Sequence, residues 1–188
     1  MTTGMAQFKG TIYLSTALFT EQRFGSEATN RVIAALPEED QQVLRDVTAI
    51  GWYPTAPIMA FHRKLDELYG SGDLALCVEV GKFSAEWTLN AVLKMFLRFR
   101  TPNWLMERSS SLWVRFHDSG RWEILEDPNV PLLARLHDFK VRDEAFCARF
   151  QGWLHGAIEL TGGKEAHVTH PRCACKGGRF CEFNGRWK

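Results

Sequence analysis

One stretch near the carboxyl end, HPRCACKGGRFCEF at residues 170–183, combines one histidine and three cysteines with basic residues and glycines. Thiolates and imidazole nitrogens are the ligands that zinc prefers, usually four of them in a tetrahedron. A metal site is therefore one interpretation. A redox pair and plain buried thiols are two others, because free cysteine often behaves as a small apolar residue. The C-x-x-C spacing typical of redox motifs is absent here, and Cys173-Ala174-Cys175 is a weak substitute.

The spacing of these residues narrows the choice of zinc ligands. The tail of the chain offers Cys147, His167, His170, Cys173, Cys175 and Cys181. The two histidines are expected on opposite faces of a strand, because strand side chains alternate. The spacer Pro171-Arg172 suits a turn that brings its neighbours to one centre, and Gly177-Gly178 lets the following loop fold back. The favoured set is Cys147, His170, Cys173 and Cys181.

Four protein ligands leave no open coordination position, so this predicted zinc would be structural rather than hydrolytic. It would attach a helix to the last hairpin, and metal binding would contribute to the free energy of folding. Cys175 is the reserve candidate for the fourth ligand, and His167 is a further alternative.

Hydrophobic periodicity predicts the elements that must position these residues. Helices are expected at residues 26–36, 37–47, 58–70, 73–102 and 143–163. Strands are expected at residues 111–117 and 121–126, as a hairpin around Asp118-Ser119-Gly120, and at 164–170 and 180–187. The pattern leaves residues 8–19 open between strand and helix, and residues 130–139 open between strand and connector. The predicted fold class is α+β, an antiparallel sheet with packed helices.

The length of 188 residues predicts a single domain over 1–188, with residues 1–50 as a helical amino-terminal extension before a core at 51–188. Hydrophobic residues make up 45% and charged residues 24%, which is typical of a soluble globular protein. The net charge of +1 gives no indication of a nucleic-acid partner, and no apolar run is long enough to span a membrane. The first residues lack the layout of a signal peptide, so we expect a cytoplasmic protein.

The sequence contains no catalytic motif, since the nucleophile elbow, the phosphate-binding loop and the H-E-x-x-H pattern are all absent. A non-enzymatic protein is therefore expected. The many aromatic residues suggest an apolar ligand pocket, although aromatics at helical spacing more often form plain core. Residues that could line such a pocket are Trp52, Tyr53, Phe61, Phe83, Trp87, Phe96 and Trp113. His62 and His117 would be its polar groups, together with the indole of Trp113.

The segment FCARFQGWLHGAIELTGGKEAHVTHPRCACKGGRFCEF resembles the 4-vinyl-reductase domain, also described as a predicted hydrocarbon-binding domain. Cys173, Gly177, Cys181 and Phe183 stand in the register C-x-x-x-G-x-x-x-C-x-F of that family. Upstream segments such as FKGTIYLSTALF, GWYP and GDLALCVEVGKFSAEW resemble a bacterial paralogous family of about 180–200 residues built around the same domain. In phenol-sensing regulators with this domain, zinc is held by a helix cysteine, an acidic residue and two loop cysteines. His170 stands where that acidic residue would be.

The resemblance implies a non-enzymatic sensor that binds a hydrocarbon, phenolic or acyl ligand, with a structural zinc. It also implies a homodimer and a downstream protein partner. One alternative is an interaction scaffold similar to the vesicle-tethering subunits of the transport-particle type, without a ligand. A weaker alternative is a reductase of tetrapyrrole vinyl groups, for which the sequence has no nicotinamide or flavin motif.

Overall fold

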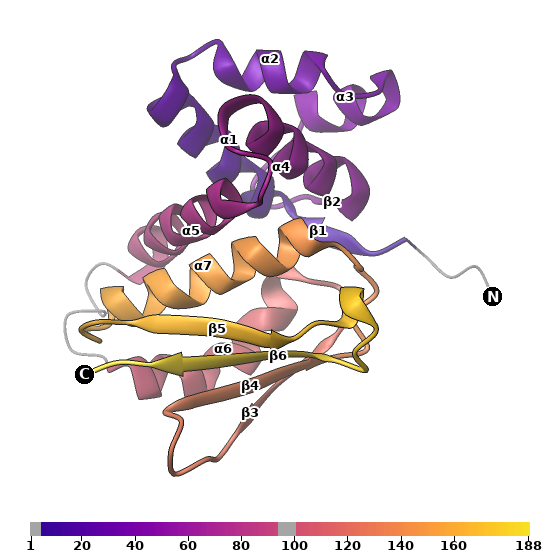
Figure 1. The fold of residues 1–188 in the computed structure, drawn as a ribbon. Helices are drawn as coiled ribbons and strands as arrows, with labels where there is room; N and C mark the ends of the chain where they lie inside the picture. Colours follow the sequence, from indigo (N-terminus) through magenta and orange to yellow (C-terminus); the bar gives the residue numbers. More distant parts are fainter. Residues whose placement is uncertain (1–4, 94–100) are drawn as a thin grey trace.

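The carboxyl-terminal half of the chain builds an antiparallel sheet with helices on one face (Figure 1). The computed structural model describes residues 5–93 and 101–188. The strands lie in the order β3-β4-β6-β5, and each neighbouring pair is antiparallel. Their bounds are Arg121–Leu125 for β3, Leu132–His137 for β4, His167–Arg172 for β5 and Cys181–Arg186 for β6. The predicted α+β class with an antiparallel sheet is therefore confirmed.

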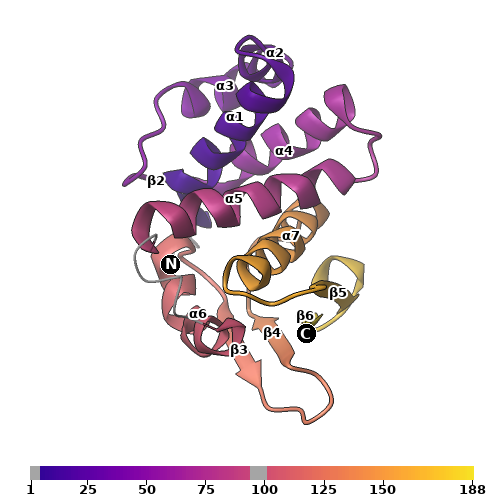
Figure 2. The same ribbon diagram turned by 90° about the vertical axis from the view of Figure 1, so that its left-hand side faces the viewer.

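The amino-terminal half forms a helical layer above this sheet (Figures 1 and 2). Its helices are α1 (Gly10–Phe24), α2 (Ala28–Ala34), α3 (Glu38–Arg45), α4 (Thr55–Tyr69) and α5 (Ala75–Leu93). A short strand, β1 (Gln7–Lys9), precedes α1 and pairs antiparallel with β2 (Trp52–Pro54). This pairing joins segments on either side of position 50. In the described residues the predicted extension thus pairs with the segment just beyond it, and the division at residue 50 stays a prediction.

Two further helices, α6 (Pro102–Phe116) and α7 (Glu144–Leu160), cover the inner face of the sheet. Thr101 caps α6 by accepting a hydrogen bond from the amide of Trp104, and Asp143 caps α7 by accepting one from the amide of Ala145. Phe150 of α7 contacts the rings of two strand residues, Trp122 of β3 and Phe183 of β6. Aromatic rings therefore pack between α7 and the inner face of the sheet.

The predicted hairpin at residues 111–126 is wrong in its first half. Residues 111–116 end helix α6, and only the second arm forms a strand, β3, whose partner is β4. The apparent alternation of residues 112–117 coincides with a helical pattern, in which Leu105, Met106, Ser109 and Trp113 are buried. Val114, which an alternating strand would place with the buried residues, is exposed. Tertiary packing along the whole helix outweighs the local alternation.

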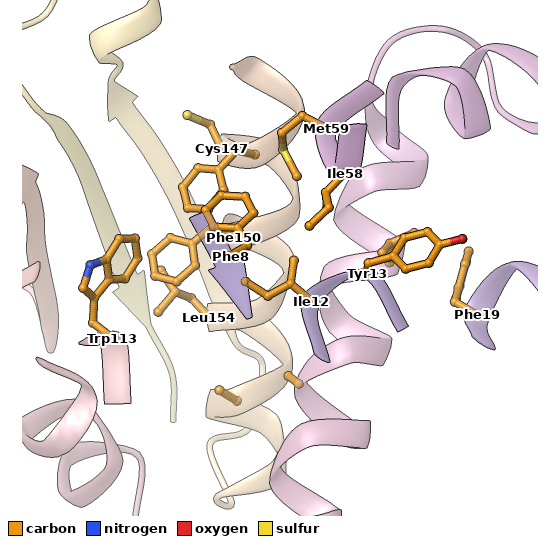
Figure 3. Packing of buried hydrophobic residues seen from close by; sticks show 14 of the residues in the cluster. Phe8, Ile12, Tyr13, Phe19, Ile58, Met59, Trp113, Cys147, Phe150 and Leu154 are labelled. Atoms are coloured by element: carbon orange, nitrogen blue, oxygen red, sulfur yellow. The ribbon is translucent and has the colours of Figure 1, made fainter. Parts of the chain in front are cut away.

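Helices α5 and α7 cross with backbone against backbone. A Cβ atom added at Gly81 would overlap the carbonyl oxygen of Arg149, and one added at Gly152 would overlap that of Val78. Only glycine permits so close an approach. The crossing joins the helical layer to the sheet layer at a fixed distance, and the buried side chains around it form one continuous core (Figure 3).

Among the helices that the structure describes, none combines the length and the apolar character needed to cross a membrane.

Candidate functional site

Three thiols and one imidazole converge at one end of α7. The ligand atoms of Cys147, His170, Cys173 and Cys181 all lie within 4.8 Å of one another. The Sγ atom of Cys147 lies 3.8 Å from that of Cys173 and 3.9 Å from that of Cys181. These are free thiols, not disulfides. The structure thus brings together the set that the sequence favoured. Whether the set binds a metal stays a prediction.

Each member of this cluster comes from a different part of the carboxyl-terminal half. Cys147 lies on the second turn of α7, His170 on β5, and Cys181 opens β6. Cys173 follows β5 and precedes a short 3-10 helix at Ala174–Lys176. The chain then turns back at Gly177, whose φ of 85° lies in the left-handed region, and the amide of Gly178 donates to the carbonyl of Cys173.

The charge distribution in the cluster is uneven. A hydrogen bond from Cys147 lowers the pKa of Cys181 to about 4, and the amide of Ala174 and the nearby His170 act in the same direction. The same hydrogen bond, together with burial, raises the pKa of Cys147 far above its usual range. The Nε2 atom of His170 is buried and has no hydrogen-bond partner. One thiolate and one unpaired imidazole nitrogen are therefore available for a cation.

The two reserve ligands are not among the four residues whose ligand atoms lie within 4.8 Å of one another. Burial and a hydrogen bond with Cys173 raise the pKa of Cys175, so this thiol borders the cluster without joining the set. His167 is exposed near the start of β5, opposite Arg186 of β6. A β-bulge between Thr169 and Arg172 interrupts the strand after that point. His170 thereby faces the thiols while His167 faces solvent.

A second feature is a small cavity where α1, α6 and α7 meet, with a volume of about 50 Å³. Its apolar walls include Ile12, Trp113, Phe150 and Leu154, which Figure 3 shows converging from the three helices. Trp113 lies parallel to His117, with the ring centroids 3.8 Å apart, and also contacts Phe150 edge-on. Aromatic side chains therefore fill most of the space between the two layers.

Apart from tryptophans, four polar residues line this cavity, namely Thr88, Ser109, His117 and Arg149. The hydroxyls of Thr88 and Ser109 donate to backbone carbonyls of their own helices. The Nε atom of Arg149 and the Nε2 atom of His117 are buried without a hydrogen-bond partner. The sequence-based reasoning missed Arg149. Its position within the apolar stripe of Phe146, Phe150 and Trp153 was the available signal, because charged residues are rarely placed on a buried helix face.

The predicted ligand pocket is not gathered into one place. Trp52 is 37% exposed and lies under Lys9, and Tyr53 hydrogen-bonds Thr48 at the surface. Phe61 packs on Tyr13 in the core, and Phe83 packs on Phe19.

Two members of the predicted pocket remain, Trp87 and Trp113. Trp87 is half-buried on α5, and Trp113 lines the cavity. The last predicted member, Phe96, lies outside the described residues. The imidazole of His62, proposed as a polar group of the pocket, is bound on both sides, by Thr16 at 2.9 Å and the carbonyl of Ile58 at 2.7 Å.

No protein-family model and no curated protein matches this sequence. Solved structures do match it. An H-NOX protein from S. oneidensis in the Fe(II)NO ligation state has a TM-score of 0.76 at 15% identity, over 96% of this chain and 99% of that chain. An oxygen-binding H-NOX domain related to soluble guanylate cyclases has a TM-score of 0.70 at 12% identity, over 96% and 95%. A third, described by heme redox potential and porphyrin distortion, has a TM-score of 0.68 at 12% identity, over 95% and 99%. At these identities the likeness establishes the H-NOX fold.

This fold corrects several expectations. The structures that match are H-NOX proteins rather than 4-vinyl-reductase domains, so the resemblance to that family and to transport-particle subunits is wrong. Three further expectations depended on that resemblance and are therefore also wrong. They are the hydrocarbon, phenolic or acyl ligand, the tethering scaffold and the vinyl reductase. The structural zinc is likewise not supported, because these structures are described by iron and heme. Two of the matched proteins are described by the ligands they bind, and the non-enzymatic character of this chain stays a prediction.

The interior of this chain does not fit a heme. Cofactor pockets have volumes of about 300–1,000 Å³, whereas the cavity between the layers measures about 50 Å³. A heme iron also needs an axial ligand such as an imidazole. Of the two described interior histidines, His62 has both ring nitrogens bound. His117 has an unbound Nε2 atom, but it lines only this small cavity. In the part of the chain that the structure describes, the space between the two layers is thus too small for a porphyrin.

Proposed function

We propose that this chain is a non-enzymatic sensor module of the H-NOX fold that works without a heme and binds a metal ion through Cys147, His170, Cys173 and Cys181. The observation that carries the proposal is the mutual approach of four ligand atoms to within 4.8 Å. A metal–sulfur bond of about 2.3 Å gives a tetrahedron with an edge of roughly 3.8 Å. The measured Sγ–Sγ distances of 3.8 and 3.9 Å match that edge.

The surroundings of the cluster support binding from solution. A groove of about 520 Å³ opens beside it, lined by Cys147, His170 and Cys173 among others. A metal ion can therefore enter without unfolding the chain. Lys176 and Glu144, which both line this groove, form an ion pair at 3.3 Å.

The proposed signal is the coupling of α7 to the last hairpin. A bound ion would fix the second turn of α7 relative to β5 and β6, and α7 in turn crosses α5 without side chains between the backbones at Gly81 and Gly152. A homodimer partner or a downstream protein would bind according to the resulting position of the helices. A cytoplasmic location agrees with five free cysteines, because thiols stay reduced there.

The test is a metal titration of the chelator-treated full chain with Co²⁺, followed by visible absorption and equilibrium dialysis. Cys173→Ser and Cys181→Ser should each lose the thiolate–cobalt absorption and most of the affinity. Cys175→Ser and Cys77→Ser are matched controls and should bind like the unaltered chain. Equal binding by all four variants would refute the metal site.

A parallel titration with hemin tests the second half of the proposal. We expect no stoichiometric complex with the unaltered chain, because side chains occupy the interior. Saturable binding of one hemin per chain, with a defined axial ligand field, would refute a heme-free module.

A further inference from the structure

Arg149 is a buried cation without a counter-charge. Its side chain is on α7 between the two layers, and the residue is 4% exposed. Its closest acceptors are the carbonyl of Ile12 at 3.5 Å and the Oγ atom of Ser15 at 3.3 Å, both long for a charge-assisted hydrogen bond. Within residues 5–93 and 101–188, no carboxylate lies within ion-pair distance of its guanidinium.

Such an arrangement is costly. Arginine is almost never fully buried unless it is paired, because removing its charge from water is strongly unfavourable. The other titratable groups that act on Arg149 do not compensate for it. Burial lowers the pKa of His62 and of His117 to about 3, and raises that of Cys77 to about 12, so all three are neutral near pH 7. The positive charge therefore has no described protein partner of opposite sign.

The cavity beside Arg149 offers space for the missing partner. Its volume of about 50 Å³ is several times the roughly 10–15 Å³ that one water molecule requires. That space corresponds to an anion of about three or four non-hydrogen atoms. A porphyrin or a long apolar chain is excluded by the same comparison.

His117 places a second polar group without a hydrogen-bond partner at the same cavity. Its Nδ1 atom lies 3.2 Å from the carbonyl of Trp113, which makes Nδ1 the protonated nitrogen and the donor. The Nε2 atom then carries the lone pair and has no donor facing it. A ligand that satisfies both residues presents negative oxygens to Arg149 and a hydroxyl to His117.

We propose that the cavity between α1, α6 and α7 binds a small planar oxyanion, with Arg149 as its counter-ion and His117 as the acceptor of its hydroxyl hydrogen bond. Bicarbonate has both the negative oxygens and the hydroxyl. Formate, nitrite and nitrate have the negative oxygens but no hydroxyl. This site is separate from the cysteine cluster, and its existence does not depend on metal binding there.

The test measures the affinity of the full chain for the four sodium salts at equal pH and ionic strength, with chloride as the reference. Thermal unfolding gives stabilisation, because a ligand that binds only the folded state raises its stability. Calorimetry and tryptophan fluorescence give the dissociation constant, since Trp113 and Trp122 lie at the cavity. Bicarbonate should raise the unfolding temperature above the chloride reference, and should bind more tightly than the other three.

Arg149→Met is the decisive variant, because it keeps the bulk of the side chain and removes the charge. Loss of a charge-assisted hydrogen bond predicts an affinity about tenfold to a hundredfold lower. The variant should also unfold at a higher temperature than the unaltered chain in chloride, because an unpaired buried charge is gone. Arg115→Met, at an exposed arginine of α6, is the matched control and should change neither quantity.

Two results would overturn the proposal: no oxyanion that stabilises the unaltered chain beyond chloride, or equal oxyanion affinity in Arg149→Met. Arg149→Lys keeps the proposal testable if the methionine variant fails to fold, because lysine preserves the charge and should retain part of the binding. Equal affinity for all four anions would remove His117 from the site.

Discussion

The imidazole of His170 lies parallel to the ring of Phe183, with centroids 4.4 Å apart and the two planes within 6°. This stack fixes the plane of the ring whose Nε2 atom has no hydrogen-bond partner. Groups that orient a metal ligand typically contribute tenfold to a hundredfold to metal affinity.

Phe183→Leu should therefore weaken Co²⁺ binding by about tenfold, although all three thiols remain. Equilibrium dialysis against the metal gives the affinity directly. Phe180→Leu is the matched control, because its ring contacts His137 and Arg135 rather than a cluster residue. Unchanged affinity in Phe183→Leu would mean that the stack does not orient the imidazole.

Gly152→Ala should lower the free energy of unfolding by about 1–3 kcal/mol or more, because its methyl group would overlap the carbonyl oxygen of Val78 in the crossing helix. Urea unfolding followed by circular dichroism measures the change. Gly156→Ala on the same helix is the comparison, since its added Cβ would lie 2.9 Å from the carbonyl oxygen of Lys82 and alanine favours helix. Equal losses at both positions would contradict a backbone contact specific to Gly152.

Asp66 joins α4 to the start of α5. Its buried carboxylate accepts hydrogen bonds from the amides of Leu74 and Leu76, at 2.8 and 3.1 Å. Asp66→Ala would leave these amides without their acceptor and should cost about 2–4 kcal/mol of stability. Asp73→Ala, at an exposed residue of the same loop, should cost less than about 1 kcal/mol, and thermal unfolding compares the two.

Stability should fall as the pH drops below about 6.5. Burial lowers the pKa of both His62 and His117 to about 3, with the nearby Arg149 acting in the same direction. Between pH 6.5 and 3 the unfolded chain therefore binds protons that the folded chain does not. Each histidine contributes a loss of up to about 1.4 kcal/mol per pH unit.

The measurement is the free energy of urea unfolding between pH 7.5 and 5.5, in the unaltered chain and in His62→Gln. The variant should show a shallower dependence, because one of the two depressed groups is gone. His167→Gln serves as the control at an exposed histidine and should follow the unaltered curve. An identical slope in all three chains would show that His62 is protonated equally in both states.

The sequence contained enough information for the cysteine cluster, because Cys147, His170, Cys173 and Cys181 are close in the chain and joined by a short turn with glycines. It also predicted the antiparallel sheet at the carboxyl end. The family resemblance failed because it depended on that same cysteine pattern. The H-NOX fold depends on the arrangement of helices around an interior that no short motif describes.

The remaining errors have particular physical causes. Residues 112–117 alternate in polarity by coincidence, and the helix forms because Leu105, Met106, Ser109 and Trp113 are buried along one of its faces. Arg149 could be noticed within an apolar stripe. That its neighbours are the neutral acceptors Ile12 and Ser15 of α1, more than a hundred positions earlier, could not be predicted. The residues predicted to line one ligand pocket lie in different parts of the structure. Aromatic composition does not indicate which rings face one another.

The crossing of α5 and α7 has a mechanical consequence. Where two helices touch through backbone atoms at Gly81 and Gly152, side-chain rotation cannot absorb a shift of one helix against the other. Cys147, Arg149 and Gly152 share less than two turns of α7. Any event that displaces that segment is therefore transmitted as a rigid movement to α5, and through α5 to the amino-terminal helices that pack on it.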